Sequence, residues 1–180
     1  MFVENTSSVG KRTYFIPMTD FNVTGYTNPA VGGAVTASAT DGTRVIPRGL
    51  AFADGTKLYA CATVRMPKSW NAGAVTLELA VETSSGTGAA VFGAQAIAIS
   101  GTDSTDIALP TATEATVTIA AAYTPVVVSL AMTPSNTPAK SDYLFIQIYR
   151  DPANAADTST ATMRLIGATV IYNVDAEKDD

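Results

Sequence analysis

Apolar and polar residues alternate along most of the chain between residues 43 and 172. The alternation is clearest at 75–81, where valine or leucine occupies every second position and threonine, glutamate and alanine lie between them. A period of two is that of a β-strand that buries one face and exposes the other. The pattern therefore predicts an all-β protein.

Eight segments of this kind follow one another, separated by turns rich in glycine, proline, aspartate and serine. We expect strands at 44–53, 58–66, 75–81, 89–99, 115–120, 125–132, 142–150 and 161–172. Short strands at a spacing of roughly ten residues are typical of a sandwich. We predict an eight-stranded antiparallel jelly-roll-like sandwich, and a short helix at 108–115 is an alternative that Pro110 disfavours.

Three regions are expected: an extended N-terminal arm (1–42), the β-sandwich (43–174) and an acidic tail (175–180). The arm is dense in glycine and proline, which argues against a helix, and we expect it to lie on its own sandwich or on a neighbour. The strand at 142–150 is apolar on both faces, so its outer face should also be covered. The aromatic residues of these two regions are our candidate interface residues. They are Tyr14, Phe15, Phe21, Tyr143, Phe145 and Tyr149.

Few residues are charged, at 15% of the chain, and the net charge is −5. So little charge indicates either a surface covered by other subunits or an exposed sheet face of threonine and serine. The acidic balance, with few clustered basic residues, disfavours nucleic acid and anionic membranes as partners. Residues 1–5 lack the features of a signal peptide, so we expect synthesis and folding in a cytoplasm.

Chemically reactive groups are sparse. The chain has no histidine, and its single cysteine, Cys61, is interpreted as a small buried hydrophobic residue in a strand. Glu78 and Glu82 lie on one side of a predicted strand and Glu114 lies elsewhere. Paired carboxylates hydrolyse glycosides, but an exposed sheet face is the interpretation we favour. We therefore expect no catalytic residues, no cofactor and no enzymatic activity.

Two loops carry possible binding residues. Asp151 and Asp157 could hold a calcium ion, or form a turn in which Asp157 pairs with Arg150 or Arg164; we favour the turn. The loop at 103–106 is interpreted as a solvated turn. Trp70 could stack on a sugar ring, but without a second aromatic platform we expect it to plug the open end of the sandwich.

Three stretches share a pattern with virion proteins of tailed bacteriophages. Residues 58–77 contain a strand that ends in Arg65-Met66-Pro67 and is followed by the Trp70 loop. Residues 145–151, with Asp157 downstream, and 163–172 continue the likeness. The chain thus resembles phage jelly-roll proteins such as capsid decoration or cement proteins.

The resemblance implies a non-enzymatic protein on the outer capsid surface of a virion. Its partners would be the major capsid protein and two further copies of itself in a homotrimer. The alternative that we keep is a phage tail or fibre adhesin, or a carbohydrate-binding β-sandwich module.

Overall fold

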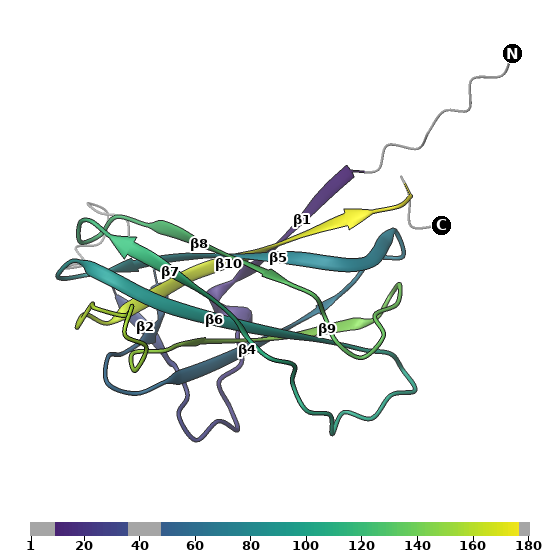
Figure 1. Ribbon diagram of the computed structural model, residues 1–180, viewed down its shortest axis with the longest axis horizontal. Coiled ribbons are helices and arrows are strands. Elements are labelled where there is room, and N and C mark those ends of the chain that lie inside the picture. The colour runs from purple at the N-terminus through teal and green to yellow at the C-terminus, as the bar shows by residue number, and fades with distance from the viewer. Residues whose placement is uncertain (1–9, 36–47, 177–180) are drawn as a thin grey trace, which may run out of the picture.

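The computed structural model describes residues 10–35 and 48–176, which form two antiparallel sheets packed face to face (Figure 1). The strands within these ranges are β1 (Gly10–Pro17), β2 (Val31–Val35), β3 (Arg48–Phe52), β4 (Leu58–Arg65), β5 (Trp70–Thr83), β6 (Gly88–Ile99), β7 (Thr113–Ile119), β8 (Val126–Met132), β9 (Tyr143–Arg150) and β10 (Met163–Val174). The described residues contain one short 3-10 turn, η1 (Met18–Asp20), and no helix that could cross a bilayer.

The connectivity from β3 to β10 is that of a jelly roll. The first sheet has the order β2-β3-β10-β5-β8, and the second has the order β4-β9-β6-β7. Antiparallel pairs join β3 to β10, β4 to β9, β5 to β8, and β6 to β7, as in one long hairpin rolled onto itself. The predicted all-β jelly-roll-like sandwich is confirmed.

Each of the eight predicted strands has a counterpart in β3 to β10. The largest difference is at β5, which is longer than predicted because Trp70 and the four residues after it, of which only Asn71 is polar, extend the strand beyond its alternating part. The helix considered at 108–115 does not form: residues 107–112 are irregular and β7 begins at Thr113. Pro110 has no N–H to donate, and the nearby threonines favour an extended chain.

The first described segment, 10–35, lies on the sandwich itself and supplies strands that the sequence analysis did not predict. All eight residues of β1 pair with β10, from Gly10 opposite Val174 to Pro17 opposite Gly167. Because β3 pairs only with residues 163–165 of β10, β1 continues the same sheet edge beyond it. Figure 1 shows β1 and the end of β10 projecting together past the other strands. The rest of the predicted arm, 1–9 and 36–42, lies outside the described residues, as do 177–180 of the tail.

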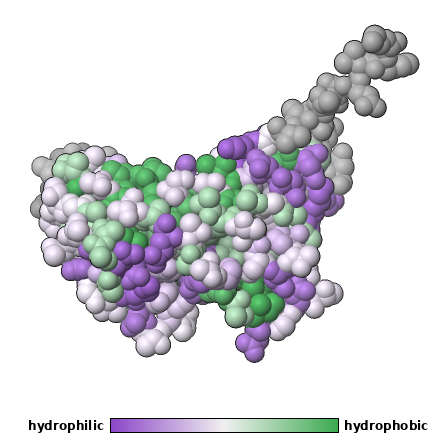
Figure 2. All heavy atoms as spheres, viewed as in Figure 1, coloured by the Kyte–Doolittle hydropathy of each residue, from purple (hydrophilic) through white to green (hydrophobic). Residues whose placement is uncertain are grey.

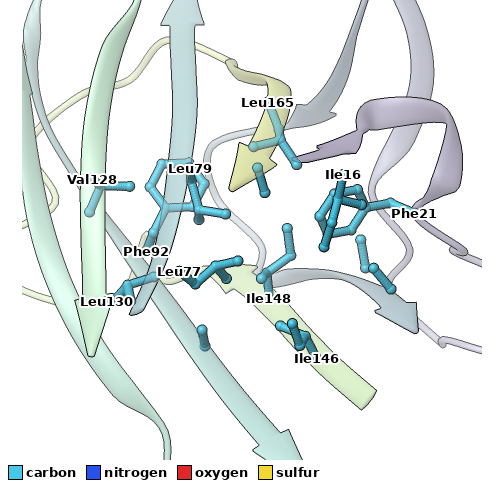
Figure 3. Close-up of a cluster of buried hydrophobic side chains, with 14 of the residues drawn as sticks. Ile16, Phe21, Leu77, Leu79, Phe92, Val128, Leu130, Ile146, Ile148 and Leu165 are labelled. Carbon is cyan, nitrogen blue, oxygen red and sulfur yellow. The ribbon is translucent and has the colours of Figure 1, made fainter. Parts of the chain in front are cut away.

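The core lies between the two sheets. The apolar side chains predicted to point inward from β5 are buried, with exposed fractions of 0–1%. Leu77 lies opposite Leu130 and Leu79 opposite Val128 in the pairing of β5 with β8. Figure 3 shows these residues in one buried cluster with Phe92 of the facing sheet. Phe92 also meets Phe52 edge to face, with ring centroids 5.7 Å apart. Burial on this scale stabilises a sandwich chiefly through the hydrophobic effect.

Candidate functional site

The middle of the outer face of the first sheet has one charged residue, Glu78, with Lys11 towards one end of the face and Glu82 and Arg164 towards the other. Residues from β1, β10, β5 and β8 form rows across it: Thr13–Ile171–Thr76–Ala131, Phe15–Thr169–Glu78–Ser129 and Pro17–Gly167–Ala80–Val127. The exposed fraction of Phe15 is 62% and that of Val127 is 59%. Small, β-branched and apolar side chains make up most of these three rows.

Phe15 is held in place by the glycine beneath it. A Cβ atom added to Gly167 would lie 2.8 Å from two carbon atoms of the Phe15 ring, so the ring occupies the space that a side chain at 167 would take. The ring therefore rests on the β10 backbone while its other side faces solvent. An aromatic ring fixed in this way loses little conformational entropy when a partner covers it.

The outer face of the second sheet carries a cluster of tyrosines. The ring of Tyr149 lies against Gly93, where an added Cβ would be 2.2 Å from it. Tyr59 contacts Tyr149, with ring centroids 5.6 Å apart, and Tyr26 stacks on Tyr59 at 5.7 Å. The Tyr149 hydroxyl donates to Glu114 at 2.8 Å, and burial raises the pKa of Tyr149 most, followed by this hydrogen bond. Side chains of the same chain therefore cover this part of the outer face of β9.

Beside the tyrosines is a hollow of about 230 Å³. Its floor is formed by the outer side of β4, β6 and β9, including Ile97, Phe145 and Gln147, and its walls by Tyr26 and by the connection between β6 and β7, including Ile107 and Leu109. None of its lining residues is charged.

Two of the polar lining residues, Gln147 and Tyr26, are joined by a hydrogen bond between their side chains. Gln147 Nε2 donates to Tyr26 Oη at 2.9 Å, and the pKa of Tyr26 is raised to about 12, chiefly by burial. Cys61 lines the hollow next to them and is half-buried rather than buried as expected. No local sequence pattern predicts this site, because Tyr26 and Gln147 are 121 residues apart.

The candidate interface aromatics fall into two groups. Tyr14, Phe15 and Tyr143 are exposed, at 48%, 62% and 42%, and Phe145 is half-buried in the hollow. Phe21 and Tyr149 are only 6% exposed, because Phe21 belongs to the core and Tyr149 to the tyrosine cluster. Those two residues contact their own chain, which corrects the expectation that they could face a partner.

The three carboxylates weighed as catalytic groups do not form a site. Glu78 lies on the outer face of the first sheet, whereas Glu114 lies on β7 of the second. Glu82 is 2% exposed rather than on an open face, opposite Arg164, and its pKa is raised chiefly by burial. Glu114 is occupied by hydrogen bonds from Tyr149 and Asn154.

Asp157 is the partner of a buried arginine. Arg150 is fully buried and donates to both carboxylate oxygens of Asp157, at 2.9 and 2.7 Å. Asp151 pairs with Lys57 instead. The arrangement is the turn favoured from the sequence, and no cluster of three metal-binding side chains occurs among residues 10–35 and 48–176.

Trp70 lies at the start of β5, paired with Val174, and is fully buried. It therefore fills one end of the core, as predicted, and offers no open surface to a sugar. The loop around 103–106 is exposed, as predicted, and Asp103 there accepts hydrogen bonds from Ser100 N and Asn136 Nδ2.

No protein-family model matches this sequence, and no curated protein sequence matches it either. Among solved structures, the chain is similar to "Family 16 Carbohydrate Binding Module-2", with 15% identity over 86% of this chain and 92% of that one, at a TM-score of 0.43. It is also similar to TmCBM61 in complex with β-1,4-galactotriose, with 8% identity over 93% and 91% and a TM-score of 0.39. A chain of the infectious bursal disease virus Gt strain gives 13% identity over 92% of this chain and 32% of that one, with a TM-score of 0.38. Likenesses at this level describe the layout of the sandwich and carry no argument about function.

Proposed function

We propose that this protein is a non-enzymatic structural protein of a bacteriophage virion, a capsid decoration or cement protein that acts as a homotrimer on the outer head surface. The observation that carries the proposal is the charge-poor middle of the outer face of the first sheet, with Phe15 and Val127 exposed among threonine, serine, alanine and isoleucine. The jelly-roll connectivity and the likeness of residues 58–77, 145–151 and 163–172 to phage virion proteins support it.

The composition of this face suits contact between proteins. Interface centres are depleted in charge and contain aromatic anchors, whereas a free surface usually mixes charges of both signs. In the three rows across the sheet, Glu78 is the one ionisable residue. Many copies on a capsid would combine modest contacts into firm attachment through avidity.

The proposal that this protein is not an enzyme is supported by the positions and hydrogen bonds of the carboxylates that were considered as catalytic or metal-binding groups. The carboxylates of Asp157 and Glu114 accept hydrogen bonds from Arg150 and Tyr149, and Glu78 lies on the opposite sheet from Glu114. A glycosidase needs two carboxyl groups facing one substrate across a short gap. These residues stabilise the sandwich instead.

The test combines solution mass with particle binding. Native mass spectrometry of the full chain should give a trimer at micromolar concentration. The protein should also cosediment with capsids assembled from the major capsid protein of the same genome, and raise the temperature at which they break. Val127→Asp should weaken the trimer or the binding, whereas Thr118→Asp, exposed on β7 of the other sheet, should not. A monomer that does not bind capsids would overturn the proposal.

The second candidate, a carbohydrate-binding module or tail adhesin, has one observation in its favour: the hollow that contains Tyr26 and Phe145. Sugar sites combine an aromatic platform with several polar groups, and aliphatic side chains dominate this lining. Reproducible binding of the wild-type protein to a glycan array, lost in Phe145→Ala, would favour this candidate over the decoration protein.

A further inference from the structure

The lining of the hollow on the second sheet is suited to binding an apolar side chain. Ile97, Ile107 and Leu109 contribute aliphatic surface, and Phe145 contributes an aromatic ring. Figure 2 shows hydrophobic atoms gathered at the lower margin of the molecule, over the connection between β6 and β7. Without a charged group in its lining, the hollow gains most from an occupant that is itself apolar.

The size of the hollow suits an aromatic ring. Its volume is about 230 Å³, and an apolar protein cavity of about 150 Å³ holds a benzene molecule. One phenylalanine side chain therefore fits, beside the hydrogen bond between Gln147 and Tyr26. A flat macromolecular surface without a raised ring would leave the hollow empty.

Phe15 on the opposite sheet is a raised ring of this kind. It is 62% exposed, the largest exposed fraction among the large hydrophobic residues described, and Gly167 beneath it sets its position. Because the ring and the hollow lie on opposite sheets, one copy cannot insert its own Phe15. A second copy can.

The charged residues beside the two features include one pair of opposite sign, while Arg65 is hydrogen-bonded to Tyr143, the strand neighbour of Ile99 in the hollow. Lys11 lies on the same side of β1 as Phe15, four residues away, or about 13 Å along an extended strand. Asp106 lies between Thr105 and Ile107, which both line the hollow, and it is exposed, as is the nearby Asp103. Oppositely charged groups around an apolar contact guide orientation and exclude wrong partners.

We propose that Phe15 of one copy seats in the hollow of a neighbouring copy, with Lys11 of the first facing Asp106 of the second. This inference rests on the proposed homotrimer and names the surfaces that build it. The contact joins two different surfaces, the Phe15 ring and the hollow, and each copy presents both. Contacts of this type close into a ring when the rotation between copies allows it. In a closed ring of three copies, each hollow holds the Phe15 ring of a neighbour.

The first experiment measures association of purified single variants by sedimentation velocity. Phe15→Ser and Ile107→Ser should each weaken self-association about 30-fold or more, the effect of truncating a central interface residue. Tyr123→Ser is the matched control, because Tyr123 is also an exposed aromatic residue, at 52%, but lies in the turn before β8. Far-ultraviolet circular dichroism should show the wild-type fold for all three variants, since the side chains removed are on the surface, although loss of the trimer will itself lower the apparent Tm of Phe15→Ser and Ile107→Ser.

Mixing the variants tests whether the two surfaces differ. Phe15→Ser keeps an intact hollow and Ile107→Ser keeps an intact ring, so the mixture should form heterodimers at concentrations where each variant alone is mostly monomeric. Lys11→Glu should weaken the trimer, and Asp106→Lys in the same chain should restore it.

The outcomes separate this inference from the proposed function. A wild-type monomer would remove the homotrimer and this contact together. A wild-type trimer unchanged by Phe15→Ser and Ile107→Ser would overturn the contact alone, and capsid binding would still test the decoration role. A small molecule or glycan that copurifies in the hollow of an intact trimer would likewise overturn it.

Discussion

The buried pair of Arg150 and Asp157 gives a sharp test of what holds one end of the sandwich. Arg150 has no exposed surface, and besides Asp157 it donates to the backbone carbonyls of Phe52, Ser159 and Ala161. Asp157 Oδ2 also accepts the Val91 N–H at 3.0 Å. These bonds tie the 151–162 connection to β3 and β6. We predict that Asp157→Asn weakens the fold severely.

The expected loss of unfolding free energy follows from the burial of Arg150 and Asp157. With Asp157 changed to asparagine, the guanidinium of Arg150 keeps its charge but loses a carboxylate whose side chain is only 1% exposed. Asp54 remains as a weaker partner, 3.8 Å away and with 39% of its side chain exposed. Leaving a buried charge without its partner costs about 3–5 kcal/mol, a large part of the roughly 5–15 kcal/mol that stabilises an ordinary domain. Asp151→Asn is the matched control. Its partner Lys57 has 34% of its side chain exposed, and such a pair contributes about 0–1 kcal/mol.

Urea denaturation of both variants, followed by tryptophan fluorescence, measures the two free energies of unfolding. A loss below about 1 kcal/mol for Asp157→Asn, or equal losses for both variants, would show that the pair does not have the role argued from its burial. Calcium chloride should leave the Tm of the wild-type protein unchanged, because Asp151 and Asp157 are already paired. A clear rise in Tm would revive the calcium hypothesis.

Three further predictions concern the core and the tyrosine cluster. Leu79→Ala should destabilise the protein by about 2–4 kcal/mol, since Leu79 is fully buried; a loss below about 0.5 kcal/mol in denaturation would contradict its place in the core. Trp70→Ala should lower the Tm, with a cost of about 3–5 kcal/mol, and should not change binding to a glycan array. Glycan binding by the wild-type protein that disappears in this variant at unchanged Tm would contradict the prediction. Stability should also fall as the pH rises above 10. The folded state keeps Tyr26 and Tyr149 protonated above the ordinary tyrosine pKa of 10.0, so it binds more protons than the unfolded chain there. Unfolding curves at pH 8 and at higher pH, with an ultraviolet titration of tyrosine, would measure this, and a flat stability profile would refute it.

The strands of the jelly roll could be predicted from the sequence because their signal is local. A strand that covers a core must place an apolar side chain at every second position, and β5 does so with Val75, Leu77, Leu79 and Val81. The enclosed position of Trp70 could also be predicted, because a lone tryptophan at a strand end has more apolar surface to bury than to expose.

β1 could not be predicted in this way because it carries almost no alternation. Only Ile16 of this strand is buried, while the residues from Lys11 to Phe15 are exposed. Its strand conformation comes from eight pairings with β10, about 150 residues later in the chain. Deleting residues 1–24 would therefore remove a strand of the sheet together with Phe21 of the core, so such a truncation cannot be used to test attachment alone.

The sequence by itself determined the class of fold, because alternation, turn residues and low charge are properties of neighbouring positions. Only the tertiary structure decided which aromatic residues are available to a partner. Phe15 and Phe21 are six positions apart, yet one rests exposed on Gly167 and the other is buried in the core. The hollow, too, depends on Tyr26 meeting Gln147 across 121 residues. Exposure and concavity arise from how distant strands pack against one another, and no local pattern encodes them.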